Sequence, residues 1–246
     1  MALQPWRKGI VTRIEEATYN TRRFWIQVPE LTSFDFKPGQ FVTLDLPIHD
    51  KPNKRWRSYS IASWPDGSNV FELLIVLLDG GAGTTYLFNE VTIGSELTLR
   101  GPAGVFVLPD VIDKDLYFIC TGTGIAPFRS MLNYMKLHPI PHQDIYLIFG
   151  TRIQKDLLYA DELRQLQKDV PHFHYIPTLS REQWEGCCGY VHAVYEGLIQ
   201  EKMNGSPDLP GAYFYLCGWK VMIDEAKERL LKMGYDKKAV HLELYG

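Results

Sequence analysis

The sequence changes its pattern near residue 110, and this change constrains the fold more than any other feature. Residues 6–108 form short segments in which apolar and polar side chains alternate between turn residues, as in Phe41-Val-Thr-Leu-Asp-Leu46. Such alternation is typical of antiparallel strands with one buried face. After Asp110, apolar strands alternate with helical segments, which indicates a parallel, doubly wound α/β sheet. We therefore expect two domains, residues 1–110 and residues 111–246.

The first domain is predicted to be a small six-stranded antiparallel β-barrel that one helix interrupts. Its strands are expected at residues 9–15, 23–28, 41–46, 57–62, 70–77 and 96–100, and its helix at 84–90. The second domain is predicted to contain a five-stranded parallel sheet with helices. Its strands are expected at 116–120, 145–149, 172–176, 213–217 and 240–244, and its helices at 127–137, 159–168, 191–201 and 220–233.

The composition excludes several classes of protein. Hydrophobic residues make up 46% of the chain and charged residues 22%, which is ordinary for a globular protein and unlike a disordered chain or coiled coil. The net charge of −3 provides no basic field for nucleic acid. The longest aliphatic run, residues 73–78, is far shorter than the ~20 residues that span a bilayer. The first residues lack an apolar export core, so we expect a cytoplasmic protein without membrane contact.

The cysteines indicate a reducing compartment. The chain has four, Cys120, Cys187, Cys188 and Cys217, and none forms a C-x-x-C pair. A plant-type iron–sulfur cluster needs a C-x₄-C-x₂-C run, which the sequence lacks. We therefore expect neither a disulfide framework nor a metal site.

The first candidate site combines an arginine on a strand with a glycine-rich loop. In Arg57-Ser-Tyr-Ser60, alternation along a strand places Arg57 and Tyr59 on one face and Ser60 on the other. The guanidinium can donate two hydrogen bonds to a phosphate, and backbone N–H groups at the start of a helix favour an anion. The site comprises Arg57, Tyr59, Ser60, Gly81, Gly83 and Thr84. The alternative is an exposed strand beside an ordinary glycine-rich loop.

The second candidate site lies at two strand ends of the second domain. Gly122 and Gly124 allow close approach of the backbone to a ligand, and Pro127 suits the first turn of a helix. This segment is similar to a dinucleotide fingerprint but has Pro127 where the common pattern has its third glycine. Cys217-Gly218 ends another parallel strand, and ligands bind at such ends. The alternative for Cys217 is a buried, inert thiol.

Together these segments resemble the ferredoxin–NADP reductase family over essentially the whole chain. Five segments match family motifs in the family's order: R-x-Y-[ST]-x-x-S at 57–63, G-x-x-[ST] at 81–84, G-P-x-G-x-F at 101–106, the nucleotide motif at 122–127 and C-G-x-x-x-M at 217–222. The resemblance implies FAD at the first site. It also implies a nicotinamide nucleotide on Gly122, Thr123, Gly124, Pro127, Cys217 and Gly218.

The end of the chain, Leu242-Glu-Leu-Tyr245, is similar to the V-E-V-Y ending of plant-type members. The resemblance implies that Tyr245 stacks on the flavin, and that Ser60, Cys217 and Glu243 approach the path of hydride transfer. Gly246 follows the tyrosine, which departs from the family pattern. The alternative for Tyr245 is an aromatic side chain that packs on the core of the last strand.

The resemblance also bears on the choice of nucleotide. Ser180-Arg-Glu-Gln183 is similar to the S-R-E-Q of NADP-using relatives, in which Ser180 and Arg181 would bind the 2′-phosphate together with Arg152. Tyr190 corresponds to an adenine-stacking tyrosine, but Cys188 stands in the place of the family's lysine. We therefore expect NADPH, with NADH as the alternative and ordinary surface cations as the alternative for both arginines. FAD is expected rather than FMN because both diphosphate-binding elements are present.

The expected function is hydride transfer between NADPH and FAD and onward transfer of electrons to an external carrier such as ferredoxin or flavodoxin. The cationic residues 51–57 are expected to attract an acidic carrier, although a solvated loop explains them equally. Three alternatives remain: an NADH-dependent reductase component of an oxygenase system, a non-catalytic electron-transfer subunit, and a nucleotide-sensing module without flavin. We expect a monomer.

Overall fold

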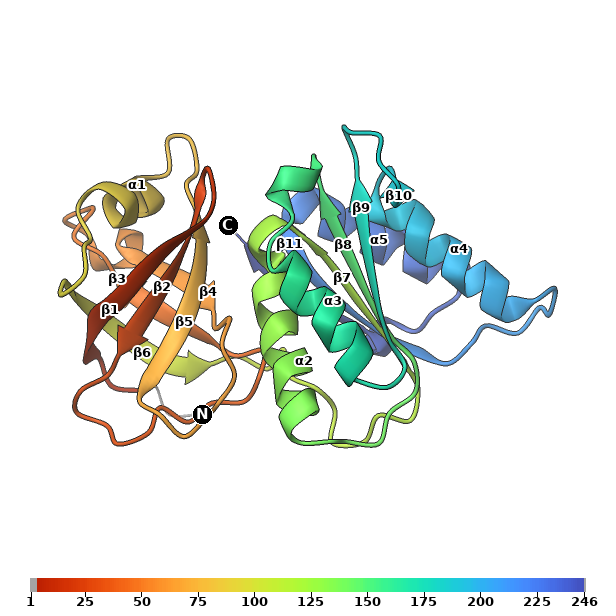
Figure 1. The fold of residues 1–246 in the computed structure, drawn as a ribbon, viewed down its shortest axis with the longest axis horizontal. Coiled ribbons are helices and arrows are strands. Elements are labelled where there is room, and N and C mark those ends of the chain that lie inside the picture. Colours follow the sequence, from red (N-terminus) through yellow and green to blue (C-terminus); the bar gives the residue numbers. More distant parts are fainter. Residues whose placement is uncertain (1–3, 246) are drawn as a thin grey trace. The chain divides into compact units, whose positions relative to one another are not determined.

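The computed structural model describes residues 4–245, with the side chain of Tyr245 outside the described part (Figure 1). The chain divides into two compact units. The first comprises Met1–Val107 together with Arg129–Tyr134, and the second comprises Leu108–Phe128 and Met135–Gly246. Within residues 4–245, no helix combines the length and apolar character needed to cross a membrane.

The first unit contains a six-stranded antiparallel sheet, as the alternating pattern predicts. Its strands lie in the order β4-β3-β6-β1-β2-β5. A single antiparallel bridge between Ile61 and Leu73 joins the two edge strands, so the sheet closes on itself. Closure satisfies backbone groups that an open edge would leave unpaired. The strands are β1 (Arg7–Thr18), β2 (Thr21–Gln27), β3 (Phe41–Asp45), β4 (Trp56–Ser60), β5 (Val70–Val76) and β6 (Glu96–Ala103).

Helix α1 (Ala82–Asn89) follows β5 and packs on the barrel through the fully buried Leu87. Its carboxyl-terminal end is held by Arg22 of β2, whose Nη1 donates to the carbonyl oxygen of Phe88 at 2.8 Å. The same guanidinium lies 4.6 Å from the centre of the Phe88 ring. A cation at this end of a helix interacts favourably with the helix dipole. These contacts fix α1, and with it the glycine-rich segment at its start.

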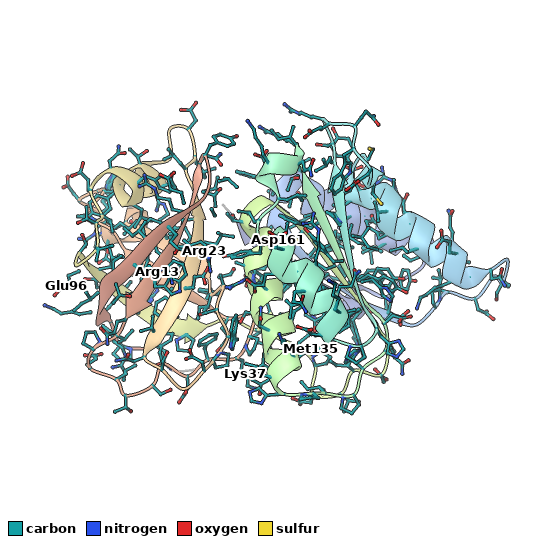
Figure 2. All side chains as sticks on the ribbon, viewed as in Figure 1. Arg13, Arg23, Lys37, Glu96, Met135 and Asp161 are labelled. Atoms are coloured by element: carbon teal, nitrogen blue, oxygen red, sulfur yellow. The ribbon has the colours of Figure 1, made fainter. Side chains whose placement is uncertain are left out.

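A buried carboxylate joins two arginines within the first unit. Glu72 of β5 is 2% exposed and accepts hydrogen bonds from Nε of Arg23 at 2.7 Å and from Nη1 of Arg129 at 2.9 Å. Arg23 lies on β2, beside the strand that carries Glu72, where Figure 2 labels it. Arg129 also donates to the carbonyl oxygen of Ala62 at 2.9 Å. A buried charge with several such partners is stable only while those partners remain.

The second unit contains a parallel sheet of six strands in the order β10-β9-β8-β7-β11-β12. Five strands match the prediction, and the sixth is the two-residue strand β10. The chain runs outward from β7 to β10 and then returns to β11, so the topology reverses between β7 and β11. The strands are β7 (Asp115–Thr121), β8 (Ile145–Thr151), β9 (Phe173–Leu179), β10 (Cys187–Cys188), β11 (Ala212–Trp219) and β12 (Val240–Tyr245).

Helices cover both faces of this sheet (Figure 1). Helices α2 (Ala126–Leu137) and α3 (Ala160–Asp169) follow the outward strands, and α4 (Val191–Met203) and α5 (Lys220–Met233) accompany the return. The core against α4 and α5 includes the fully buried Tyr117, Ile119 and Phe214. Strand β9 extends three residues beyond the predicted end and includes Pro177. A proline is tolerated here because β10, the neighbouring edge strand, pairs only with Thr178 and Leu179.

Helix α4 is tied to the amino ends of two strands by a charged cluster. Nζ of Lys202 donates to Asp115 at 2.5 Å and to Asp144 at 2.7 Å. Burial disfavours the Asp144 carboxylate, but hydrogen bonds from Lys202 and His174 prevail and lower the pKa of Asp144 to about 2. This cluster lies at the amino-terminal ends of the strands, whereas ligands bind at the carboxyl-terminal ends in this topology. We therefore infer that the cluster stabilises the fold and does not bind a ligand.

Glu72→Gln is expected to destabilise the protein because Arg23 and Arg129 would lose the buried carboxylate that both contact, although Arg23 would keep its pairing with the more exposed Glu15. Breaking such a buried pair costs about 3–5 kcal/mol. The free energy of unfolding in urea and the midpoint of thermal unfolding measure the loss. The matched control is Glu96→Gln, since Glu96 pairs with Lys8 on the exposed outer end of β6 (Figure 2) and should change stability by less than ~0.5 kcal/mol. Equal stability of both variants would contradict the assignment.

Candidate functional site

In the first unit, Arg57 and the start of α1 touch. A Cβ atom on Gly83 would lie 3.0 Å from Cγ and 3.2 Å from Nε of Arg57. The Arg57 guanidinium is oriented by the main chain, because its Nη1 donates to the carbonyl oxygens of Trp56 at 2.8 Å and Lys54 at 3.1 Å. The structure thus brings together two of the predicted anion-binding elements, a guanidinium and the first turn of a helix. A side chain at position 83 would press on Arg57 and shift its guanidinium.

The hydroxyl of Thr84 serves the loop itself. It donates to the carbonyl oxygen of Gly81 at 3.0 Å and accepts from the backbone N–H of Leu78 at 3.1 Å. Gly81 is also crowded, since a Cβ there would lie 2.7 Å from Oγ1 of Thr84. The first N–H groups of a helix have no partner within that helix. Thr84 therefore shapes the loop, and the N–H groups of the first turn are the donors that remain for an anion.

Tyr59 and Ser60 lie on opposite faces of β4, as alternation predicts. Tyr59 is paired with Val42 and Arg57 with Leu44, so both side chains lie on the face that carries the barrel core. Tyr59 packs against that core, and burial raises the pKa of its phenol to about 12 although Arg57 opposes the shift. The phenol is therefore neutral at physiological pH. Ser60 is buried opposite Phe41.

In the second unit, a short 3₁₀ helix at Gly122–Ile125 connects β7 to α2. Gly122 has φ of +55°, a value that favours glycine. Gly124 packs against the end of β11, and a Cβ there would lie 2.3 Å from the carbonyl oxygen of Cys217. Pro127 is the second residue of α2 and lies in its first turn, as predicted. The two glycines therefore have distinct functions: Gly122 makes the turn, and Gly124 permits two backbones to touch.

The end of β11 completes this arrangement. Gly218 has φ of +145°, and a Cβ there would lie 2.5 Å from Oγ1 of Thr121 and 3.2 Å from Cε of Met222. Glycine is therefore required between Cys217 and the helix that follows. Met222 packs beneath Gly218, which explains the spacing of the C-G-x-x-x-M segment. These contacts lie at the topological reversal between β7 and β11, where open α/β sheets bind ligands.

Cys217 itself is fully buried. It is paired with Cys120 of β7 on one side and with Glu243 of β12 on the other. Glu243 is therefore adjacent to Cys217 in the sheet. Cys120 is also buried, and burial raises the pKa of its thiol, which indicates an inert side chain.

A pocket of about 380 Å³ lies beyond the carboxyl end of β9. It is lined by Leu179, Ser180, Arg181, Glu182, Gln183, Cys188 and Gly189. Backbone hydrogen bonds link its wall to the end of β8: Ser180 donates to Thr151 at 3.0 Å, and Arg181 donates to Arg152 at 2.9 Å. The two arginines are therefore neighbours through their main chains. Of the residues that the sequence analysis proposed for a 2′-phosphate, Ser180 and Arg181 line the pocket, and Arg152 is adjacent to Arg181 through its main chain.

Three further residues lie in or near this pocket, and of these the sequence analysis gave a role to Tyr190 and none to Glu182. Glu182 contributes a carboxylate to the lining, and its Oε2 accepts from the backbone N–H of Gln154 at 2.6 Å. The Cys188 thiol, which stands where the resemblance implies a lysine, lies 3.5 Å from Oε1 of Gln183. Tyr190, the proposed adenine-stacking residue, is 73% exposed at the start of α4. Trp219, at the end of β11, is also largely exposed. No sequence pattern distinguished it from core tryptophans.

Within residues 4–245, no group of three or more histidine, cysteine or acidic residues could hold a metal ion. The prediction that Tyr245 covers the flavin concerns a side chain outside the described residues, and the same is true of Gly246. Glycine lets the start of α1 lie against Arg57 and the turn after β7 lie against Cys217, and the first N–H groups of the helices that begin there have no partner within the helix and favour an anion. The residues present therefore fit FAD and a nicotinamide nucleotide.

Comparison with protein families agrees with this division. The chain matches the Oxidoreductase FAD-binding domain over residues 8–108 and the Oxidoreductase NAD-binding domain over residues 118–228. Among curated proteins, it is 37% identical over 216 residues to ferredoxin–NADP reductase B of Sorangium cellulosum, which covers 87% of this chain and 86% of that protein. It is 31% identical to the phenol hydroxylase P5 protein of Acinetobacter pittii, covering 86% of this chain but 58% of that protein.

Solved structures give the same result. The cytochrome P450 reductase GcoB of Amycolatopsis superposes on all of this chain and 72% of its own, with a TM-score of 0.83 and 25% identity. A ferredoxin NADP⁺ reductase from Neisseria gonorrhoeae with bound FAD and NADP superposes on 97% of this chain and 98% of its own, with a TM-score of 0.78 and 25% identity. The protein is an oxidoreductase that uses FAD and a nicotinamide nucleotide. This chain belongs to the ferredoxin–NADP reductase family.

Proposed function

We propose that this chain oxidises NADPH and passes the electrons to an acidic one-electron carrier of the ferredoxin or flavodoxin type. The observation that carries the proposal is that a glycine in each unit lets a helical turn lie against its neighbour, Gly83 against Arg57 and Gly124 against the carbonyl oxygen of Cys217. We propose that each arrangement is a phosphate cradle, one for a flavin and one for a nicotinamide nucleotide. Bound FAD supplies the conversion between two-electron and one-electron transfer. The curated relative from Sorangium cellulosum is named for the same pair of reactants.

The first unit is proposed to hold the FAD. Arg57 and the N–H groups of the first turn of α1 neutralise the diphosphate, while Thr84 keeps that turn in place through Gly81 and Leu78. The ring of Tyr59 supplies a flat apolar surface that stays neutral, since its pKa is raised to about 12. Ser60 is assigned a hydrogen bond to the flavin ring. Two elements for a diphosphate favour FAD over FMN.

The second unit is proposed to hold the nucleotide in two parts. One part is the cradle at the topological reversal, which binds the diphosphate and comprises Gly122, Thr123, Gly124, Pro127, Cys217 and Gly218. The other is the pocket at the ends of β8 and β9, in which Ser180, Arg181 and Arg152 bind the 2′-phosphate and Tyr190 covers the adenine. Cys217 packs behind the nicotinamide, and Glu243, its neighbour in the sheet, assists proton exchange. Tyr245 is assigned to the flavin.

A second candidate is an NADH-dependent reductase component of an oxygenase system. One observation favours it: the carboxylate of Glu182 lines the pocket beside Arg181. A carboxylate beside the ribose of NADH can accept a hydrogen bond from its 2′-hydroxyl and would repel a 2′-phosphate. However, Glu182 is already engaged by the N–H of Gln154 at 2.6 Å. We therefore expect the positive charge of Arg181 to outweigh that carboxylate, so that the site binds NADPH more tightly than NADH.

Gly83→Val is expected to lower the affinity for FAD by about 10- to 100-fold, because the added side chain displaces the charge-assisted hydrogen bonds of Arg57. The dissociation constant is measured by titrating the apoprotein with FAD. The matched control is Gly197→Ala, another helical glycine, which has open space around it and should bind FAD as the wild type does. Unchanged affinity of the Gly83 variant would contradict the cradle.

Arg181→Ala is expected to lower kcat/KM for NADPH by about 10- to 100-fold, the value of one charge-assisted hydrogen bond to phosphate. The value for NADH should change little, because NADH lacks the 2′-phosphate. Anaerobic reduction of the flavin by each nucleotide, followed by its absorbance, measures both rates. Arg164→Ala removes a cation of α3 that pairs with Asp161 and serves as the control. A wild type that prefers NADH would support the second candidate.

The rate of electron transfer to an acidic ferredoxin is expected to fall steeply with added salt. Among the cations of residues 51–57, Arg55 pairs with Asp45, whereas Lys51 and Lys54 are exposed. Lys51→Glu combined with Lys54→Glu should lower the association rate about tenfold or more at low salt and flatten the salt dependence. Lys237→Glu combined with Lys238→Glu is the matched control. A flat salt response of the wild type would contradict docking at this segment.

A further inference from the structure

Two consecutive cysteines at the edge of the parallel sheet have no role in the proposed reaction. Cys187 and Cys188 form the short strand β10, and both thiols are free and exposed. The other two cysteines of the chain, Cys120 and Cys217, are buried. Because thiol chemistry depends on access to the sulfur, a reagent in solution reaches the pair on β10 far more readily than the buried pair.

The two exposed thiols have different surroundings. Adjacent side chains of a strand point to opposite faces of the sheet. Cys188 lines the pocket of about 380 Å³ together with Ser180 and Arg181, whereas Cys187 is not among the described residues that line it. A group attached to the sulfur of Cys188 would therefore enter the pocket, and one attached to Cys187 would lie outside it.

The sulfur of Cys188 is held at a defined place. Its Sγ lies 3.5 Å from Oε1 of Gln183. The backbone before it is fixed by Trp184, whose Nε1 donates to the carbonyl oxygen of Cys187 at 2.7 Å. The backbone after it is fixed by the N–H of Gly189, which donates to the carbonyl oxygen at the end of β9 at 2.8 Å. The thiol therefore stays at the pocket.

The other lining groups indicate what kind of group the pocket accepts. Arg181 contributes a guanidinium. The carboxylate of Glu182 also lines the pocket, but it accepts a hydrogen bond from the backbone N–H of Gln154 at 2.6 Å, which offsets part of its charge. The volume is in the range of sites for small molecules. A small peptide-like thiol that carries carboxylates, of the glutathione class, therefore suits this pocket.

We propose that Cys188 is a thiol-modification site that closes the pocket to the 2′-phosphate of NADPH. Its sulfur attacks one sulfur of a small anionic disulfide. The S–S bond of that disulfide breaks, a mixed disulfide with Cys188 forms, and the other half leaves as a thiol with the proton of Cys188. The attached group then occupies the space beside Ser180 and Arg181 with its own negative charge. The inference rests on the proposed function and adds regulation to it.

The adjacent thiol does not reverse this step. Cys187 would have to attack the mixed disulfide from the opposite face of β10, which alternation along a strand prevents. The modification therefore persists until an external thiol attacks it, and Cys188 is then restored by the same exchange in reverse. Cys187 differs from Cys188 by one position and is equally accessible, so it is the matched control.

The test measures nucleotide binding before and after modification. The FAD-loaded, oxidised protein is incubated with oxidised glutathione, the adducts are located by mass spectrometry of peptides, and NADP⁺ is titrated by calorimetry. Treatment should weaken NADP⁺ binding about tenfold or more in the wild type and in Cys187→Ser, because the contact of Arg181 with the phosphate is lost. Dithiothreitol should restore the affinity. In Cys188→Ser, treatment should leave the affinity unchanged.

Protection by the nucleotide gives a second readout. Dithiobis(nitrobenzoate), a disulfide that releases a coloured thiolate, should react quickly with two thiols of the folded wild type, those of Cys187 and Cys188. Saturating NADP⁺ should slow the reaction of one of them and leave the other unchanged. In Cys188→Ser, the remaining fast thiol should react at the same rate with and without NADP⁺.

The outcomes separate this inference from the proposed function. Unchanged NADP⁺ affinity of wild type that carries the adduct on Cys188 would overturn the inference and leave the proposed function intact. Absence of an adduct on Cys188 would also overturn it. Weaker binding by treated Cys188→Ser would assign the effect to Cys187 and overturn it as well. Untreated wild type that binds no NADP⁺ would overturn the proposed function, and the inference with it.

Discussion

The arrangement of the second unit depends on one contact between two backbones. The carbonyl oxygen of Cys217 occupies the space into which a Cβ atom of Gly124 would project, only 2.3 Å away. The contact brings the turn after β7 against the end of β11, at the point where the strand order reverses. Gly218 and Thr121 meet at the same point. Any side chain at position 124 would separate the turn after β7 from the end of β11. The close approach of these two segments, on which the proposed nucleotide cradle depends, is therefore a consequence of sheet packing.

In the first unit, which has an antiparallel sheet, a glycine also allows a close approach at the start of a helix. A phosphate group needs exposed N–H donors and a nearby cation, and both must be fixed before the ligand arrives. In the barrel, Gly83 lets α1 approach Arg57, and Arg22 holds the other end of the helix. In the parallel sheet, Gly124 allows the approach. In both units the glycine allows a close approach because it has no Cβ atom, and the hydrogen-bond donors are main-chain N–H groups. This explains why short glycine motifs were informative in this sequence while the identity of their neighbours was less so.

Sequence patterns predicted the strands because burial on one face imposes a period of two, and Phe41–Asp45 shows it clearly. They also predicted the glycine turns, because few other residues allow them. They missed the end of β9, since Pro177 signals a strand end unless the neighbouring strand is known to be short. The hydroxyl of Thr84 was expected at a ligand, but its partners are backbone groups that only the folded loop brings near. The sequence patterns did not indicate that Glu182 lines a pocket or that Trp219 is exposed, because both properties depend on parts of the chain that are distant in sequence.

The distribution of charge shows why a protein with a net charge of −3 can bind two polyanionic ligands. Electrostatic attraction to a phosphate falls off within a Debye length of ~8 Å at physiological salt, so nearby groups outweigh the total. Arg57 lies beside α1, and Arg181 and Arg152 lie at the ends of β9 and β8. In the proposed nucleotide site, the cradle for the diphosphate lies between β7 and β11, on different strands from the pocket that contains Arg181. On this proposal, a substitution at Arg181, Glu182 or Cys188 would change the choice of nucleotide without disturbing the cradle.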